Sequence, residues 1–225
     1  MEIVFIRHGE PEWVREGRNV DNPPLTARGV RQAEAMAVAL AGEHFDEVYC
    51  SPLVRARQTA APLFAALGRS ETIDPWLEEI RNPIWQGTPQ DVADQAYAEQ
   101  RRRNAHDRWA GLDGANRCAT SSIASISAAP CSSPSARFAA SRATTRCGRW
   151  PSPNVGSRSS RTRARTPVAI CHLLGIPAVP WEWDRFVLGH ASISRVRSMQ
   201  MGDGHTFCLT KLSDVEHLTA ADRTE

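Results

Sequence analysis

The first ten residues, M-E-I-V-F-I-R-H-G-E, constrain the fold of this chain more than any other stretch. Residues 3–6 form a short apolar run without helical period, so we predict a fully buried β-strand. This strand would deliver Arg7, His8 and Gly9 to its carboxyl end, which is the edge where open α/β sheets bind ligands. The stretch therefore predicts an α/β protein with a candidate site at the end of its first strand.

The residues that follow the predicted strand suit an oxyanion ligand. An arginine can bind phosphate through its guanidinium group, and Gly9 would let the backbone approach such a ligand closely. The His8 imidazole could then act as a nucleophile and carry a covalent intermediate. The alternative interpretation is that Arg7 and His8 end a strand and face the solvent, because short motifs also occur by chance.

The chain then alternates helix and strand signals. After a loop over 10–24, Thr26 is a good N-cap for a helix with a predicted apolar stripe of Val30, Ala33, Ala37 and Leu40. We predict a strand over 45–50 and a helix after Ser51-Pro52. Further along, 89–109 is helical in character and rich in charge, and the P-V-A-I-C-H-L-L-G stretch from Pro167 predicts another helix.

Arg55 falls in the first turn of the helix after Ser51-Pro52, where a helix N-terminus and a guanidinium group both attract phosphate. The alternative is a surface ion pair. Trp13 and Arg18 in the preceding loop could contact a substrate, or could be a loop clamp and a solvated charge. The stretch W-L-E-E-I at 76–80 contains two acids, Glu78 and Glu79, beside large apolar groups. One of them could have a raised pKa and act as a general acid. The alternative is that both are exposed carboxylates.

Composition limits the class of protein. A chain of 225 residues suits one α/β domain over 1–225. It has no apolar run near the roughly 20 residues of a membrane span and begins directly with a strand, so we expect a cytoplasmic protein without signal peptide or membrane contact. The six cysteines lack C-x-x-C or zinc spacing, which predicts free thiols and no metal site.

The net charge of +2 conceals an uneven distribution. Residues 115–166 contain nine arginines and no Asp, Glu or Lys, which leaves 18 basic and 25 acidic residues elsewhere, a formal charge of −7. The mild total therefore gives no reason to expect nucleic-acid binding. The alternative is that 115–166 is an Arg/Ser-rich arm that binds nucleic acid through counterion release.

Four ordered motifs resemble the histidine phosphatase superfamily, the phosphoglycerate-mutase-like enzymes: R-H-G-E at 7–10, P-L-T-A-R-G-V-R-Q-A at 24–33, S-P-L-V-R-A-R-Q-T-A at 51–60, and L-E-E-I with W-Q-G at 77–80 and 85–87. The resemblance implies a three-layer α/β/α sandwich. It also implies that His8 becomes phosphorylated without a cofactor or metal, that Arg7 and Arg55 hold the phosphoryl group, and that Glu79 protonates the leaving oxygen. It assigns structural roles to Thr26, Gly29 and Gln32.

Phosphatases and mutases of this family share the chemistry, so the loop after the first strand has to distinguish them. Mutases resemble one another in a W-N step and an F-T-G-W stretch there, whereas this chain has E-W-V at 12–14 and D-N-P-P-L-T at 21–26. We therefore expect a phosphatase acting on small-molecule phosphate monoesters. Mutase-type phosphoryl transfer is the alternative, and the oligomeric state is left open.

The chain departs from the family in its middle. A second histidine in an apolar strand followed by H-x-G, and a G-G-E-S stretch before a helix, are both missing. In their place 115–166 is dominated by Ser, Arg, Ala, Thr and Pro, a composition that predicts disorder or irregular structure. Two further classes thus stay open, an inactive relative and a silent phospholigand-binding protein.

We interpret 115–166 as a frameshifted segment. If each codon boundary moves back by one nucleotide, the stretch from Gly114 to Ser121 can encode G-E-S-L-R-D-F, and 156–165 can encode an apolar strand followed by H-A-G-T. Both missing motifs then return in the expected order. The normal frame would resume near Thr166.

The last stretch predicts a β-hairpin. Residues 192–199 and 205–212 alternate as paired strands around Gly202-Asp203-Gly204. We interpret His190 in G-H-A-S as a structural loop residue, with substrate contact as the alternative, and His172 as a helix residue without a catalytic role. The polar tail over 214–225 is expected to fray.

Overall fold

The computed structural model describes residues 1–78, 83–112, 165–179, 181 and 184–225. Within them lie the strands β1 (Glu2–Ile6), β2 (Val14–Arg15), β3 (Arg18–Asn19), β4 (Ile193–Met201) and β5 (Gly204–Asp214). The α-helices are α1 (Ala27–Leu40), α2 (Val54–Ala66), α3 (Gln90–Arg102) and α5 (Arg165–Leu173). Short 3-10 helices occupy Pro75–Leu77, Asp107–Ala110 and Ala220–Asp222.

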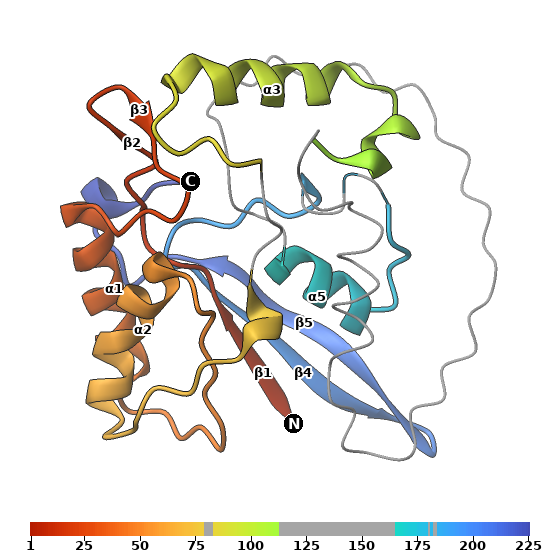
Figure 1. The fold of residues 1–225 in the computed structure, drawn as a ribbon. Helices are drawn as coiled ribbons and strands as arrows, with labels where there is room; N and C mark the ends of the chain where they lie inside the picture. The colour runs from red at the N-terminus through yellow and green to blue at the C-terminus, as the bar shows by residue number, and fades with distance from the viewer. Residues whose placement is uncertain (79–82, 113–164, 180, 182–183) are drawn as a thin grey trace.

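The main β-sheet of the described residues has the strand order β1-β4-β5, and both neighbouring pairs are antiparallel. The register sets Ile6 opposite Ile193 and Glu2 opposite Arg197, so the first strand of the chain pairs with a strand near its end. Helices α1 and α2 lie on one side of this sheet and α5 on the other (Figure 1). This arrangement confirms the predicted α/β/α layers.

The core between the sheet and α1 and α2 explains why these segments fold as they do. Thr26 caps α1 by accepting a hydrogen bond from the Gly29 N–H at 3.0 Å, as predicted. The predicted stripe needs one correction: Val30 is 43% exposed, and Met36, fully buried, points into the core instead. The core cluster consists of Met36, Ala37, Leu40, Leu63, Ala191 and Ile193, with Val4 and Ile6 packed against it.

Two strand predictions are wrong in part. β1 is partly buried rather than fully buried, because β4 is the one strand with which it pairs in the described part of the chain. Residues 45–50 form no strand; there Cys50 makes a single bridge, to Ile73. A segment with a β pattern forms a strand only when a neighbouring segment pairs with it over several residues. Among the described residues, 45–50 has only the bridge between Cys50 and Ile73.

The end of the chain contains one confirmed prediction and one error. β4 and β5 form the predicted hairpin around residues 202–204. The expectation of a fraying tail is wrong, because Leu218 is 2% exposed and Asp222 pairs with Arg31 at 2.6 Å. Local polarity predicted fraying, whereas contacts with α1, far away in the sequence, hold this segment in place.

Several predictions lie outside the described residues. They concern Glu79 and residues 113–164, which contain nearly all of the segment interpreted as frameshifted. The helix predicted from Pro167 is present as α5. Every helix that the structure describes is too short or too polar to span a membrane.

Candidate active site

The candidate site forms where β1 ends beside the residues that precede β4. Backbone pairing continues past β1, because the Arg7 N–H donates to the Ser192 carbonyl and the Ala191 N–H donates to the His8 carbonyl, both at 3.1 Å. This pairing brings residues 190–192 alongside residues 7–8. The two stretches are distant in the sequence, with 183 positions between Arg7 and His190.

A chain of hydrogen bonds connects the end of β1 to α2. The Gly9 N–H donates to Thr59 Oγ1 at 2.9 Å, and the Thr59 hydroxyl donates to the Arg55 carbonyl at 2.7 Å. Thr59 is one helical turn after Arg55, so this contact fixes the first turn of α2 next to His8. Arg55 is 2% exposed, which excludes the surface ion pair considered as its alternative.

Gly9 and Gly29 allow the loop after β1 to touch α1. A Cβ at Gly9 would lie 2.5 Å from the Gly29 carbonyl oxygen, and a Cβ at Gly29 would lie 2.2 Å from the Glu10 carbonyl oxygen. The structure thus gives a reason for Gly9 that is separate from the predicted close approach to a ligand. The glycine is needed because two backbones cross with no room for a side chain.

His8 has the electrostatics of a neutral imidazole. Its Nδ1 lies 2.8 Å from the Gly9 carbonyl oxygen, which can only accept, so Nδ1 carries the ring proton and Nε2 keeps its lone pair. Burial, followed by the positive charges of Arg55 and Arg7, holds the pKa of His8 well below its ordinary value. The Nε2 atom is buried and has no hydrogen-bond partner among the described residues.

The two arginines beside His8 are held from different directions. The Arg55 guanidinium lies over the Trp13 ring, with Cζ 4.8 Å from the ring centroid. Arg7, 7% exposed, donates through Nη1 to the Leu188 carbonyl and lies with Nη2 at 3.1 Å from His190 Nε2. Both cations are thus fixed before any ligand arrives.

His190 lies beside His8 and Arg7, although the sequence favoured a structural loop residue at this position. Its ring centroid lies 5.9 Å from that of His8, and the residue is 5% exposed. Nothing in G-H-A-S indicates this place, because it depends on the pairing of β1 with β4. The one available signal was its position two residues before the strand predicted over 192–199, because residues at strand ends can lie in a site.

The structure brings Arg7, His8 and Arg55 together, whereas Glu79 lies outside the described residues. Arg18 is exposed and donates to the Gly87 carbonyl at 2.8 Å, which fits the solvated charge better than a substrate contact. Among the residues that the structure describes, no group of three or more His, Cys, Asp or Glu side chains is arranged to bind a metal ion.

Two curated relatives each match about half of the chain. Phosphoserine phosphatase 1 of Hydrogenobacter thermophilus is 32% identical over 105 residues, which are 46% of this chain and 50% of that protein. 2-carboxy-D-arabinitol-1-phosphatase of Triticum aestivum is 30% identical over 118 residues, which are 50% of this chain and 23% of that protein. The chain therefore spans half or less of the length of these relatives.

Two solved structures are similar to this chain in fold. A mycobacterial glucosyl-3-phosphoglycerate phosphatase aligns with a TM-score of 0.60 at 19% identity, covering 94% of this chain and 98% of that one. The α-ribazole phosphatase of Shigella flexneri aligns with a TM-score of 0.60 at 22% identity, covering 95% and 96%. The sequence model of the histidine phosphatase superfamily (branch 1) matches residues 3–122, more than half of the chain, and the protein belongs to this superfamily.

Proposed function

We propose that the protein is a phosphatase that hydrolyses small-molecule phosphate monoesters through a phosphohistidine at His8. The observation that carries the proposal is the buried Nε2 lone pair of His8, held between the charges of Arg7 and Arg55. The names of the relatives, phosphoserine phosphatase and 2-carboxy-D-arabinitol-1-phosphatase, support the same class of reaction.

In the first step, His8 Nε2 forms a bond to phosphorus as the bond between phosphorus and the ester oxygen breaks. The low pKa of His8 keeps Nε2 unprotonated at neutral pH, so that it is available as a nucleophile. Arg7 and Arg55 stabilise the negative charge on the transferred phosphoryl group. Glu79 is proposed to donate a proton to the leaving oxygen.

In the second step, water hydrolyses the phosphohistidine. The Glu79 carboxylate takes a proton from water, the water oxygen bonds to phosphorus, and the bond between Nε2 and phosphorus breaks. Inorganic phosphate leaves and Glu79 is again protonated. Throughout both steps His8 Nδ1 keeps its proton and donates a hydrogen bond to the Gly9 carbonyl. Nε2 therefore returns to its starting state.

The test compares wild type with His8→Ala on p-nitrophenyl phosphate, together with incorporation of acid-labile phosphate. We expect the substitution to abolish both hydrolysis and labelling. Equal rates of hydrolysis for wild type and His8→Ala would contradict the proposal.

Two arginines of α2 offer a matched comparison for the phosphate-binding role. Arg55 is buried beside His8, whereas Arg57 is exposed and pairs with Glu71 at 2.8 Å. We expect Arg55→Gln to lower kcat/KM by about 100-fold or more, as losing a group that stabilises transition-state charge does. Arg57→Gln should stay within about twofold of wild type, because exposed ion pairs contribute little.

A second candidate, a catalytically silent phospholigand-binding protein, is favoured by the missing apolar strand and H-x-G motif in 115–166. Binding of inorganic phosphate without hydrolysis or labelling would support this candidate. Labelling at His8 without turnover would mean that the first step proceeds alone.

A further inference from the structure

His190 makes contacts that the proposed reaction does not use. It is 5% exposed and follows Gly189 in the loop before β4, where its backbone N–H donates to the Thr224 carbonyl at 2.9 Å. Its ring is tilted by 38° relative to the His8 ring. The side chain therefore lies between His8 and Arg7 on one side and the segment 218–224 on the other.

The partners of His190 determine where its ring proton lies. Arg7 Nη2 can only donate, so His190 Nε2, at 3.1 Å, accepts this hydrogen bond. A neutral imidazole has one N–H, which must then be on Nδ1, and Nδ1 lies 2.8 Å from Thr224 Oγ1. His190 is thus a neutral imidazole protonated on Nδ1, with the hydroxyl of Thr224 as acceptor.

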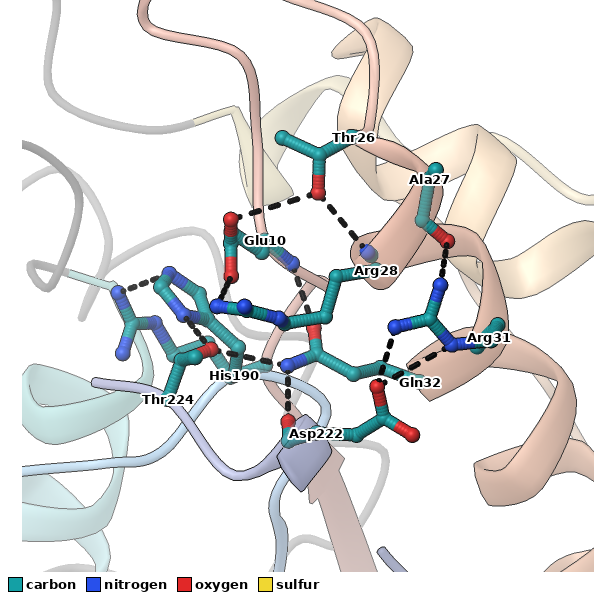
Figure 2. Close-up of polar contacts among 11 residues, drawn as sticks. Glu10, Thr26, Ala27, Arg28, Arg31, Gln32, His190, Asp222 and Thr224 are labelled. Carbon is teal, nitrogen blue, oxygen red and sulfur yellow. Dashed lines mark hydrogen bonds and ion pairs between the residues drawn. The ribbon is translucent and has the colours of Figure 1, made fainter. Parts of the chain in front are cut away.

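Thr224 is itself held by α1. Gln32, fully buried, donates through Nε2 to Thr224 Oγ1 at 2.9 Å and to the Asp222 carbonyl at 2.6 Å. Its Oε1 accepts the Glu10 N–H at 2.7 Å. Figure 2 shows Gln32 between Glu10 on one side and Asp222 and Thr224 on the other. A continuous set of hydrogen bonds thus connects the loop after β1 with the segment 218–224.

We propose that His190 is a positioning residue for the phosphate site, protonated on Nδ1 by its bond to Thr224 so that Nε2 holds the guanidinium of Arg7. The Leu188 carbonyl accepts from the other terminal nitrogen of the same guanidinium. A long arginine side chain loses rotamer freedom when it binds an anion, and fixing it beforehand reduces this cost of binding. The inference rests on the proposed function, since it concerns the same site.

Two substitutions distinguish the roles of the two ring nitrogens of His190. His190→Gln places an amide oxygen near the position of Nε2 and can still accept from Arg7. His190→Asn provides an N–H near the position of Nδ1 but no acceptor for Arg7. By isothermal titration with inorganic phosphate, we expect His190→Asn to bind about tenfold or more weakly, as loss of a hydrogen bond to a charged group implies, and His190→Gln to bind close to wild type.

Thr224→Val tests the second half of the proposal. Histidine ring ¹⁵N NMR of the wild type should show His190 protonated on Nδ1. In Thr224→Val the Nδ1 N–H loses its acceptor, so the ring that holds Arg7 should be fixed less firmly and phosphate binding should weaken as in His190→Asn. His172→Asn on the exposed side of α5 and Thr210→Val on β5 are matched controls, and both should bind phosphate like wild type.

Two results would overturn the inference: a wild-type His190 protonated on Nε2, or equal phosphate affinity in His190→Asn and His190→Gln. The NMR measurement on wild type needs no variant to fold, and thermal unfolding of each variant identifies a general loss of structure. A wild-type chain that binds no phosphate while His190 is protonated on Nδ1 would contradict the proposed function, yet support the hydrogen-bond arrangement inferred here.

Discussion

At the residue scale, His8 combines burial with two neighbouring positive charges. Both conditions oppose a second proton on the ring, which is why the pKa of His8 falls well below its ordinary value. The hydrogen bond from Nδ1 to the Gly9 carbonyl raises the pKa of His8, but by less than burial and the two arginines lower it. The same environment that costs stability in acid makes Nε2 available as a nucleophile at neutral pH.

The lowered pKa of His8 predicts how stability depends on pH. An unfolded chain protonates His8 below a pH of about 6.5, whereas the folded chain does so at lower pH. The unfolded state then binds more protons, so stability falls as pH decreases below that value, by at most about 1.4 kcal/mol per pH unit for one group. Urea unfolding at several pH values between 5 and 7.5 measures this slope.

The comparison variant for this slope is His8→Gln, which removes the titrating group. Its stability should fall less steeply with decreasing pH than that of wild type. The partly buried His217 also has a pKa lowered chiefly by desolvation, so a remaining slope in the variant is expected. Identical slopes for wild type and His8→Gln would contradict the assignment.

At the element scale, the crossing of the loop after β1 with α1 decides the shape of the site. Gly9 and Gly29 face each other across this crossing, and the Glu10 N–H donates to Gln32 one turn further along α1. Arg28 also pairs with Glu10 at 3.2 Å. The P-L-T-A-R-G-V-R-Q-A motif thus serves to dock a helix against the backbone that follows His8.

Gly29→Ala tests this docking. Alanine favours a helix over glycine by about 1 kcal/mol, but its Cβ would lie 2.2 Å from the Glu10 carbonyl oxygen. Since backbone must move to relieve the clash, we expect a net loss of about 1–3 kcal/mol in the free energy of unfolding. Chemical denaturation measures the loss. Gly42→Ala, with nothing within 4 Å of its Cβ, should be near neutral.

At the scale of the whole molecule, the beginning and the end of the chain build the site together. β1 pairs with β4, Arg7 bonds to Leu188 and His190, and the segment 218–224 packs on α1. Contacts this distant in sequence close a long loop, whose entropy must be offset by the core between α1, α2 and the sheet. The candidate site is therefore complete only once the ends have met.

The middle of the chain leads to a prediction about its gene. We expect sequencing of the DNA across codons 114–166 to show a second frame that encodes G-E-S-L-R-D-F near its start and an apolar strand with H-A-G-T near its end. Ordinary Ser and Arg codons without such an alternative frame would contradict the frameshift interpretation. The family model matches residues 3–122 and so reaches into the start of this segment, whereas α5 begins at Arg165, near its end.

The sequence by itself determined the features that depend on neighbouring residues. The β1 strand with its Arg-His-Gly end, the Thr26 cap, the start of α2 with Arg55 and the β4–β5 hairpin follow from local propensity, capping and turn chemistry. The four ordered motifs were also sufficient to indicate the superfamily. These signals act within a few residues and need no knowledge of the rest of the fold.

Only the tertiary structure decided the remainder. Residues 45–50 form no strand, because they lack a pairing strand among the described residues. His190 lies beside Arg7, and the polar segment 218–224 is hydrogen-bonded to α1. Each outcome depends on a partner more than twenty residues away or on the lack of one among the described residues. Propensity and hydrophobic period describe what a segment can form, whereas pairing and burial by distant segments determine what it does form.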